Sequence, residues 1–153
     1  TYAEIGHARK ISKMIILYRN KKKMNTTEDL KKSIYEALDG CSNKIFSRVF
    51  QAIRIAVNNE ISTFKKTLEI VPQYLNQGGR VAVISFHSIE DRIAKHFFKN
   101  GVMIDEENYY KSKRINNKQV FNILTKKPII ANKDELLVNR RSRSAKLRVA
   151  ELL

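Results

Sequence analysis

The stretch that decides the fold class is GGRVAVISFHSIEDR, residues 78–92. Its central run, residues 81–86, is apolar without alternation, which is typical of a strand buried on both faces in a parallel sheet covered by helices. Two glycines precede the run. A helical pattern follows it, with Ser88 as the expected N-cap and acids in the first turn. A strand placed between two helical segments in this way predicts an α/β fold.

The loop after this strand is the densest polar site in the sequence. Residues 86–92 combine an imidazole, a hydroxyl, two carboxylates and a guanidinium around a helix start. Open α/β sheets bind their ligands at the carboxyl ends of the strands, so these residues form a candidate site. A plainer interpretation stays open, in which Ser88 only caps the helix, Asp91 and Arg92 lie on the surface, and His87 fills a gap.

Three helical patterns come before the strand. The first covers residues 3–20, and the second begins after a cap at Asn25 or Thr26 and stops at Gly40. The third covers residues 44–75, with Pro72 able to kink its tail. Its apolar face is formed by Phe46, Phe50, Ile53, Val57, Ile61, Phe64 and Leu68. A polar stripe borders this face and indicates either a cleft or ordinary boundary hydrogen bonds: Ser47, Gln51, Arg54 and Asn58.

The remainder of the chain predicts two further strands. Residues 101–119 are polar and irregular, as in a surface loop. Residues 120–125 read as a strand, and Asn132 is placed to cap a short helix that ends near Val138. A basic loop covers residues 140–146. Residues 147–153 read as a strand that closes the sheet, with an antiparallel edge as one option.

The charge balance points to a polyanionic partner. The 153 residues include 30 Lys and Arg against 15 Asp and Glu, a net charge of +15. Residues 9–23, 109–127 and 140–148 contain cations and no acid. Nucleic acid is the first expectation and an anionic membrane surface the second, although charge runs are also common on ordinary solvated faces.

Composition excludes several classes of protein. At 42% hydrophobic residues the chain is no disordered basic tail. The longest stretch without a charged residue is 70–79, too short for a transmembrane helix, and no apolar signal segment opens the sequence, so we expect a cytoplasmic protein without membrane contact. A single cysteine excludes a disulfide within the chain. The histidine spacing predicts no metal site, and no glycine-rich phosphate loop follows a strand.

Four motifs stand in order along the chain: FQAIRIAVNNE at 50–60, residues 78–92 as quoted above, LTKKP at 124–128 and NRRSRSAKLRVAE at 139–151. Together they closely resemble the MraW/RsmH family, bacterial methyltransferases that modify N4 of a cytosine in the decoding centre of the 16S ribosomal RNA. The opening IGHARKI at 5–11 also fits this family. Residues 101–119 are the least similar part.

This resemblance implies a class I, Rossmann-like methyltransferase that uses S-adenosylmethionine and carries an inserted all-helical domain. Residues 1–43 would be the C-terminal part of that inserted domain. Residues 44–153 would be the C-terminal half of the methyltransferase domain, with its last strands at 80–86, 120–125 and 147–152. The first half of such a fold, with the cofactor-binding loop, has no counterpart here. We therefore assign no cofactor-binding residue and expect no methyl transfer by these residues alone.

The resemblance also suggests roles for individual residues. His87 or Asp91 would orient the target base, Phe86 would stack on it, and Ser88 belongs to the same catalytic loop. RNA contacts would come from Arg54, Asn58, Arg92, Arg140, Arg141, Arg143, Lys146 and Arg148. The partners would be ribosomal RNA in the small subunit and either the missing half or a second copy of the chain. The alternative is a non-catalytic RNA-binding or ribosome-assembly module derived from the family.

Overall fold

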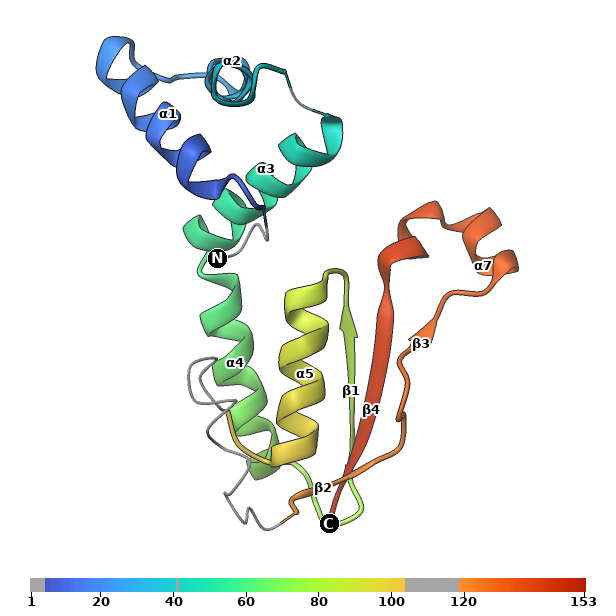
Figure 1. Cartoon of the computed structure of the whole chain (residues 1–153). Coiled ribbons are helices and arrows are strands. Elements are labelled where there is room, and N and C mark those ends of the chain that lie inside the picture. Colours follow the sequence, from blue (N-terminus) through green and yellow to red (C-terminus); the bar gives the residue numbers. More distant parts are fainter. Residues whose placement is uncertain (1–4, 41, 104–118) are drawn as a thin grey trace. The chain divides into compact units, whose positions relative to one another are not determined.

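The computed structural model describes residues 5–40, 42–103 and 119–153 and forms two compact units (Figure 1). The first unit is Thr1–Glu60 and the second is Ile61–Leu153. The division into compact units falls after Glu60, and the inserted-domain boundary after residue 43 that the resemblance implies stays a prediction. The expected loop at 101–119 and the basic run at 109–127 lie largely outside the described residues.

The first unit consists of three helices, α1 (Ala8–Lys21), α2 (Thr27–Leu38) and α3 (Asn43–Val57). Each follows the apolar periodicity of its sequence, which confirms the first two helical predictions. The apolar faces meet in one core, formed by Ile11, Leu30, Ile34, Ala37, Phe46 and Val49. Tyr35 packs edge-on against Phe46, with ring centroids 5.1 Å apart. The cations of α1 lie outside this core and are exposed, as on an amphipathic surface helix.

Helix α2 begins with a complete capping box. The backbone N–H of Asp29 donates to Oγ1 of Thr26 at 3.1 Å, and Oδ2 of Asp29 accepts from the backbone N–H of Thr26 at 3.1 Å. These bonds satisfy donors that a helix start otherwise leaves without partners. The hydrogen bond from the Thr26 hydroxyl is the main cause that lowers the pKa of Asp29 to about 2.

The single helix expected over residues 44–75 is wrong, because the chain breaks after Val57. Helix α4 (Glu60–Ile70) is a separate helix after two non-helical residues, and it is followed by a short 3-10 turn, η1 (Val71–Tyr74). Asn59 adopts a left-handed backbone conformation with φ 53°, which asparagine tolerates better than most residues. Val57, expected on the apolar face, is 77% exposed. The apolar periodicity continues across this break, so it could not predict that one residue, Asn59, adopts a left-handed conformation.

The second unit is built on a small sheet in which every strand pairs with β4 (Lys146–Leu152). The order is β1 (Arg80–Ser85), β4, then β2 (Phe121–Ile123), while the two-residue β3 (Ile129–Ile130) also pairs with β4. All three pairings are antiparallel. The expected parallel ladder for residues 81–86 is therefore wrong for the described strands. β4 is the central strand, and not the edge strand considered from the sequence.

One feature of the expected parallel arrangement is nevertheless present. Because β1 and β2 both run antiparallel to the same strand, they run parallel to each other. β1 ends the strand order, so within the described residues only one of its two edges is paired. The other edge leaves backbone donors and acceptors open to a further strand.

Helix α5 (Ser88–Asn100) and α4 cover one face of this sheet, as Figure 1 shows for α5. The core on that face contains Leu68, Phe97, Phe98, Phe121 and Ala150. Burial along β1 alternates, so the strand is not buried on both faces as expected. Ile84 points to the other face and is 61% exposed. An apolar run of residues is compatible with burial of both faces of the strand. It does not show that both faces are covered by residues of the described part of the chain.

Two smaller elements complete the unit and confirm the expected cap. Helix α7 (Lys133–Val138) begins where the Asn132 side chain accepts a hydrogen bond from the backbone N–H of Glu135 at 2.8 Å. The 3-10 turn η3 (Arg140–Ser144) leads from α7 into β4. The described part of the chain contains no helix that is both long and apolar enough to cross a membrane.

Replacing Thr26 with alanine tests the capping box. The substitution removes the acceptor for the Asp29 N–H, so the free energy of unfolding should fall by about 1 kcal/mol. Thr27→Ala serves as the matched control, since Thr27 is exposed and lies outside the box. Urea denaturation followed by circular dichroism measures both. Equal stability of the two variants would contradict the role given to Thr26.

Candidate functional site

The loop after β1 is held closed by Glu90. The backbone N–H of Phe86 donates to Oε2 of Glu90 at 3.0 Å, and the backbone N–H of Glu90 donates to Nδ1 of His87 at 3.4 Å. The residue that caps α5 is therefore His87, and the predicted Ser88 cap is wrong: Ser88 is the first helical residue and is exposed. Phe86 is 57% exposed at the end of the strand, where it is available to a ligand.

The hydrogen bond to Nδ1 indicates which of the two ring nitrogens carries the proton when His87 is neutral. Because Nδ1 accepts, the neutral ring has its proton on Nε2. Nε2 is buried and lies 3.2 Å from Oε1 of Glu90, but it makes no well-aligned hydrogen bond among the described residues. Both ring nitrogens of His87 therefore face Glu90, Nδ1 its backbone N–H and Nε2 its carboxylate.

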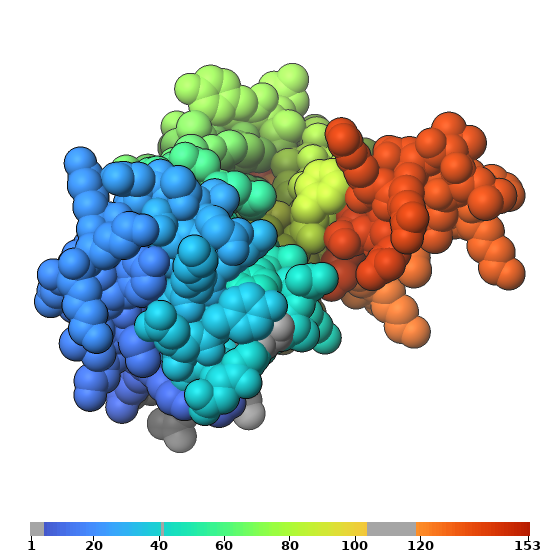
Figure 2. Space-filling model, turned by 90° about the horizontal axis from the view of Figure 1, so that it is seen from above, coloured from blue at the N-terminus to red at the C-terminus, as the bar shows by residue number. Residues whose placement is uncertain are grey.

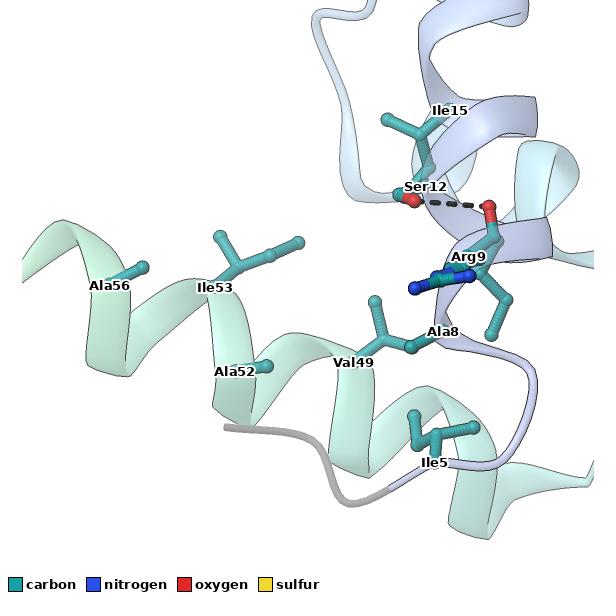
Figure 3. A pocket seen from close by; sticks show the side chains of 10 residues that line it. Ile5, Ala8, Arg9, Ser12, Ile15, Val49, Ala52, Ile53 and Ala56 are labelled. Atoms are coloured by element: carbon teal, nitrogen blue, oxygen red, sulfur yellow. Dashed lines mark hydrogen bonds between the residues drawn. The ribbon is translucent and has the colours of Figure 1, made fainter. Parts of the chain in front are cut away.

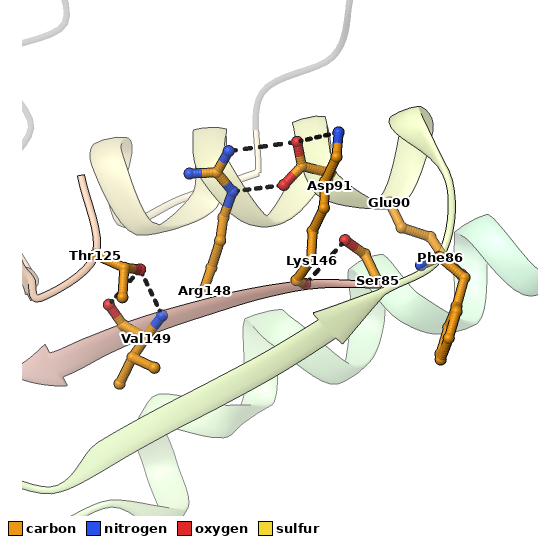
Figure 4. Close-up of polar contacts among 8 residues, drawn as sticks. All are labelled: Ser85, Phe86, Glu90, Asp91, Thr125, Lys146, Arg148 and Val149. Atoms are coloured by element: carbon orange, nitrogen blue, oxygen red, sulfur yellow. Dashed lines mark hydrogen bonds and ion pairs between the residues drawn. The ribbon is translucent and has the colours of Figure 1, made fainter. Parts of the chain in front are cut away.

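Asp91 forms a buried ion pair with the central strand (Figure 4). Nε of Arg148 donates to Oδ1 of Asp91 at 2.7 Å, and Nη2 donates to Oδ2 at 3.3 Å. Nζ of Lys146 lies 3.4 Å from the same Oδ2. Burial acts to raise the pKa of Asp91, but the hydrogen bond and charge of Arg148, helped by Lys146, outweigh it and lower the pKa.

Neighbouring hydroxyls fix the strand that carries these cations. Ser85, at the end of β1, is buried and its Oγ donates to the Lys146 carbonyl at 3.4 Å. Further along β4, the backbone N–H of Val149 donates to Oγ1 of Thr125 at 2.8 Å. Figure 4 shows both contacts on either side of the Asp91–Arg148 pair. The guanidinium of Arg148, in a residue only 7% exposed, thus belongs to a rigid frame.

The basic segment before β4 presents its arginines to solvent. Arg140, Arg141 and Arg143 are exposed, whereas Ser142 between them is buried. The Ser142 hydroxyl donates to the Asn139 carbonyl at 2.7 Å, and this contact fixes η3. Figure 2 shows the C-terminal part of the chain, which contains this segment, in orange to red at the surface. In this segment the three arginines are exposed to solvent, and Ser142 is buried and fixes the backbone through its hydrogen bond.

Two of the expected RNA-contacting residues, Arg54 and Asn58, converge on one acid in the first unit. Arg54 donates to both carboxylate oxygens of Glu60, at 2.8 and 3.0 Å, and the Asn58 amide donates to the same group at 3.1 Å. All three lie at the break between α3 and α4. Arg92 belongs to the second unit, where it is exposed on α5. The structure thus brings together Phe86, His87 and Asp91 with Lys146 and Arg148.

A groove in the first unit is a second hollow of interest. It has a volume of about 360 Å³ and lies between α1 and α3. Figure 3 shows Ser12 and Ile15 of α1 on one side and Ile53 and Ala56 of α3 on the other. Arg9 is the one charged residue among the described residues that line it. An aliphatic groove of this kind supplies no acid or base, so the polar loop after β1 remains the candidate site.

Two acidic residues that hold predicted functional groups were not identified from the sequence, one in each unit. Glu90 orders the loop and Glu60 holds Arg54 and Asn58. The first had a signal, since an acid three residues after a helix cap is typical of a capping box. The second had none, because its role depends on a break in the helix that the sequence did not predict.

Gly78 and Gly79 come before β1 and not after it, so no glycine loop cradles a ligand at the carboxyl end of the strand. The two acids at that end are both engaged, Glu90 with the Phe86 amide and Asp91 with Arg148. Among residues 5–40, 42–103 and 119–153, no group of three histidine, cysteine or acidic side chains could hold a metal ion.

Comparison with known proteins gives a consistent match over the whole chain. The MraW methylase family matches residues 1–153. Ribosomal RNA small subunit methyltransferase H of Flavobacterium psychrophilum is 41% identical over 153 residues, which cover 98% of this chain and 51% of that protein. The protein of the same name from Caldicellulosiruptor saccharolyticus is 44% identical over 164 residues, covering 98% of this chain and 50% of the relative.

The chain thus spans about half the length of the curated relatives it matches. The match includes all four motifs noted in the sequence, among them the loop that carries His87 and Asp91. We conclude that the chain belongs to the MraW methylase family.

Proposed function

We propose that this chain forms the C-terminal half of an S-adenosylmethionine-dependent methyltransferase that acts on N4 of a cytosine in small-subunit ribosomal RNA. The observation that carries the proposal is the incomplete sheet, considered together with family membership. β1 has one edge without a partner among the described strands, and Ile84 on its uncovered face is largely exposed. Further parallel strands and helices would continue the sheet at that edge.

The chemistry of the target defines what such an enzyme has to supply. The exocyclic N4 of cytosine is a poor nucleophile, because its lone pair is delocalised into the ring. The base also has to leave its stack before an enzyme can reach it. Positioning of the amine is then the largest contribution to the rate of methyl transfer, and a polar group beside N4 assists the loss of its proton.

The loop after β1 suits positioning better than proton removal. Exposed Phe86 offers a ring on which a flipped base can stack. His87 would orient the base indirectly, by capping α5 and holding the loop through Glu90, with Ser88 beside it at the helix start. Asp91 has a lowered pKa and a buried partner, so it is a weak base and would act by holding the loop against β4.

RNA binding would be shared among the exposed cations. Arg140, Arg141 and Arg143 are placed for phosphate contacts, while Arg92 and Lys146 lie nearer the loop. The expected contacts of Arg54, Asn58 and Arg148 would be indirect, because each of the three is engaged with a carboxylate in this structure. Such phosphate contacts position an RNA without reading its sequence. An enzyme of ribosomal RNA would work in the cytoplasm.

The alternative is a non-catalytic RNA-binding or assembly module. The absence of a cofactor-binding arrangement in the described residues favours it, since nothing there would fix a methyl donor. The unpaired edge of β1 favours the enzyme, because a module that had become self-sufficient would gain by covering that edge.

A chimera tests the function. We expect the chain to support methylation when it replaces the corresponding half of the Flavobacterium relative, with which it is 41% identical. The host would lack its own enzyme, and mass spectrometry of digested ribosomal RNA would detect N4-methylcytidine. A folded chimera that leaves the RNA unmethylated, while the intact relative restores the mark, would contradict the proposal.

Calorimetry tests where the cofactor binds. Titration of S-adenosylmethionine into the 153-residue chain should give no measurable heat of binding, because the residues that would hold it belong to the other half. The chimera should bind the cofactor under the same conditions. A clear binding isotherm with the chain alone would show that the account of the cofactor site is mistaken.

Asp91→Asn tests the buried ion pair. The variant leaves the Arg148 guanidinium buried without its counter-charge, so the free energy of unfolding at pH 7 should fall by about 3 kcal/mol. Because folding lowers the pKa of Asp91, the stabilisation is present above its unfolded value of about 3.9 and is lost at lower pH. The difference in free energy of unfolding between the variant and the wild-type chain should therefore become smaller as the pH falls below 4.

Denaturation with urea at a series of pH values measures this difference. The matched control is Glu69→Gln, which removes one exposed acid from α4 and should change stability little. If Asp91→Asn and Glu69→Gln are equally stable at pH 7, Asp91 does not hold the loop as described.

A further inference from the structure

A pocket in the second unit is lined by cations from α5, from β4 and from the segment that follows β2. It has a volume of about 160 Å³, several times the roughly 30 Å³ that a water molecule occupies in the liquid. Its charged lining residues are Lys95, Lys99, Lys126 and Arg148, and none of the described residues that line it is acidic. Phe98, which is buried, contributes an apolar wall.

The sequence places two of these lysines where they repel each other. Lys95 and Lys99 are four residues apart on α5, so their side chains lie on the same face of the helix. A like-charge pair at this spacing destabilises a helix by a few tenths of a kcal/mol. The helix dipole stabilises the charge of Lys99, which lies in the last turn of α5. Lys126 follows β2 and gains no such stabilisation.

Lys126 is placed by the anchored residue before it. The backbone N–H of Thr125 donates to the Val149 carbonyl at 3.2 Å, and the Val149 N–H donates to Oγ1 of Thr125 at 2.8 Å. These two bonds fix the chain next to Lys126 against the central strand. The third lysine thus reaches the pocket from a rigid support.

Arg148 is paired with Asp91, but the charge of the three lysines is not neutralised within the described part of the chain. Lys95, Lys99 and Lys126 form no ion pair there, and the nearby Asp91 already binds Arg148 and Lys146. The neighbouring His96 is half-buried beside several of these cations. Its pKa is lowered first by burial and then by the charges of Lys95, Arg92, Lys99 and Arg148.

We propose that this pocket binds a backbone phosphate of the RNA, with Lys95, Lys99 and Lys126 as its ligands. The inference rests on the proposed function, which makes RNA the substrate, and it adds a site apart from the loop after β1 and from the arginines of η3. Lysine ammonium groups bind phosphate as point charges and do not select a base, so the site would position the RNA and not read its sequence.

Salt dependence of RNA binding tests the pocket. The chain would be titrated with a structured fragment of small-subunit ribosomal RNA at several KCl concentrations, with fluorescence anisotropy as readout. The double variant Lys99→Gln/Lys126→Gln should bind several-fold more weakly at low salt. Its slope of log K against log salt should be smaller by about 1, the effect of one lost phosphate contact.

The control has the same net charge. Lys44→Gln/Lys66→Gln removes two exposed lysines outside the pocket, and thermal unfolding checks that both double variants fold. Equal slopes for the two double variants would overturn the proposal while the function stands. A wild-type chain with no salt-dependent RNA binding would overturn the RNA part of the function as well.

A second arm separates RNA phosphate from free phosphate. Inorganic phosphate titrated into the wild-type chain should shift the amide resonances of residues 95–99 and 125–126 only weakly, at millimolar concentrations, and not at all in Lys99→Gln/Lys126→Gln. Tight saturation by inorganic phosphate, together with an unchanged RNA slope in that variant, would assign the pocket to a free anion and overturn the proposal.

Discussion

The carboxylate of Asp91 ties the first turn of α5 to the central strand β4. Its partner Arg148 is almost fully buried, and a buried guanidinium without a counter-charge costs several kcal/mol, so neither group can move without the other. The pair therefore determines where the loop at 86–90 lies relative to the sheet. Ser85 and Thr125 extend the same constraint along β4 through its backbone. The candidate site and the lysine pocket are thus attached to one strand.

Much of the local structure could be predicted from the sequence. The helices with clear apolar faces, the caps at Thr26 and Asn132, and the strand at 80–85 each follow from a short-range pattern that specifies one conformation. The strand pairing could not be predicted in the same way. An apolar strand reads alike beside a parallel or an antiparallel neighbour, and the position of β4 between β1 and β2 depends on contacts across tens of residues.

The candidate site shows the same division. Proximity in sequence identified the loop at 86–92, because all of its polar groups lie within two turns of one helix start. The engagement of Asp91 with Arg148 joins residues 57 positions apart, and only the folded chain shows that it turns two expected functional groups into a support. The lysine pocket was missed for a related reason, since it combines Lys95 and Lys99 on one helix face with Lys126 from a distant part of the sequence.

The central place of β4 also bears on how the second unit is made by a ribosome. β1, β2 and β3 have no described strand partner until residues 146–152 have been synthesised and have left the exit tunnel. Until then the second unit supplies no described strand partner for residues 80–85. Pairing over such a separation is slow compared with helix formation, so the three-helix unit can fold first while the sheet waits. Chaperone dependence would then concentrate in the second unit.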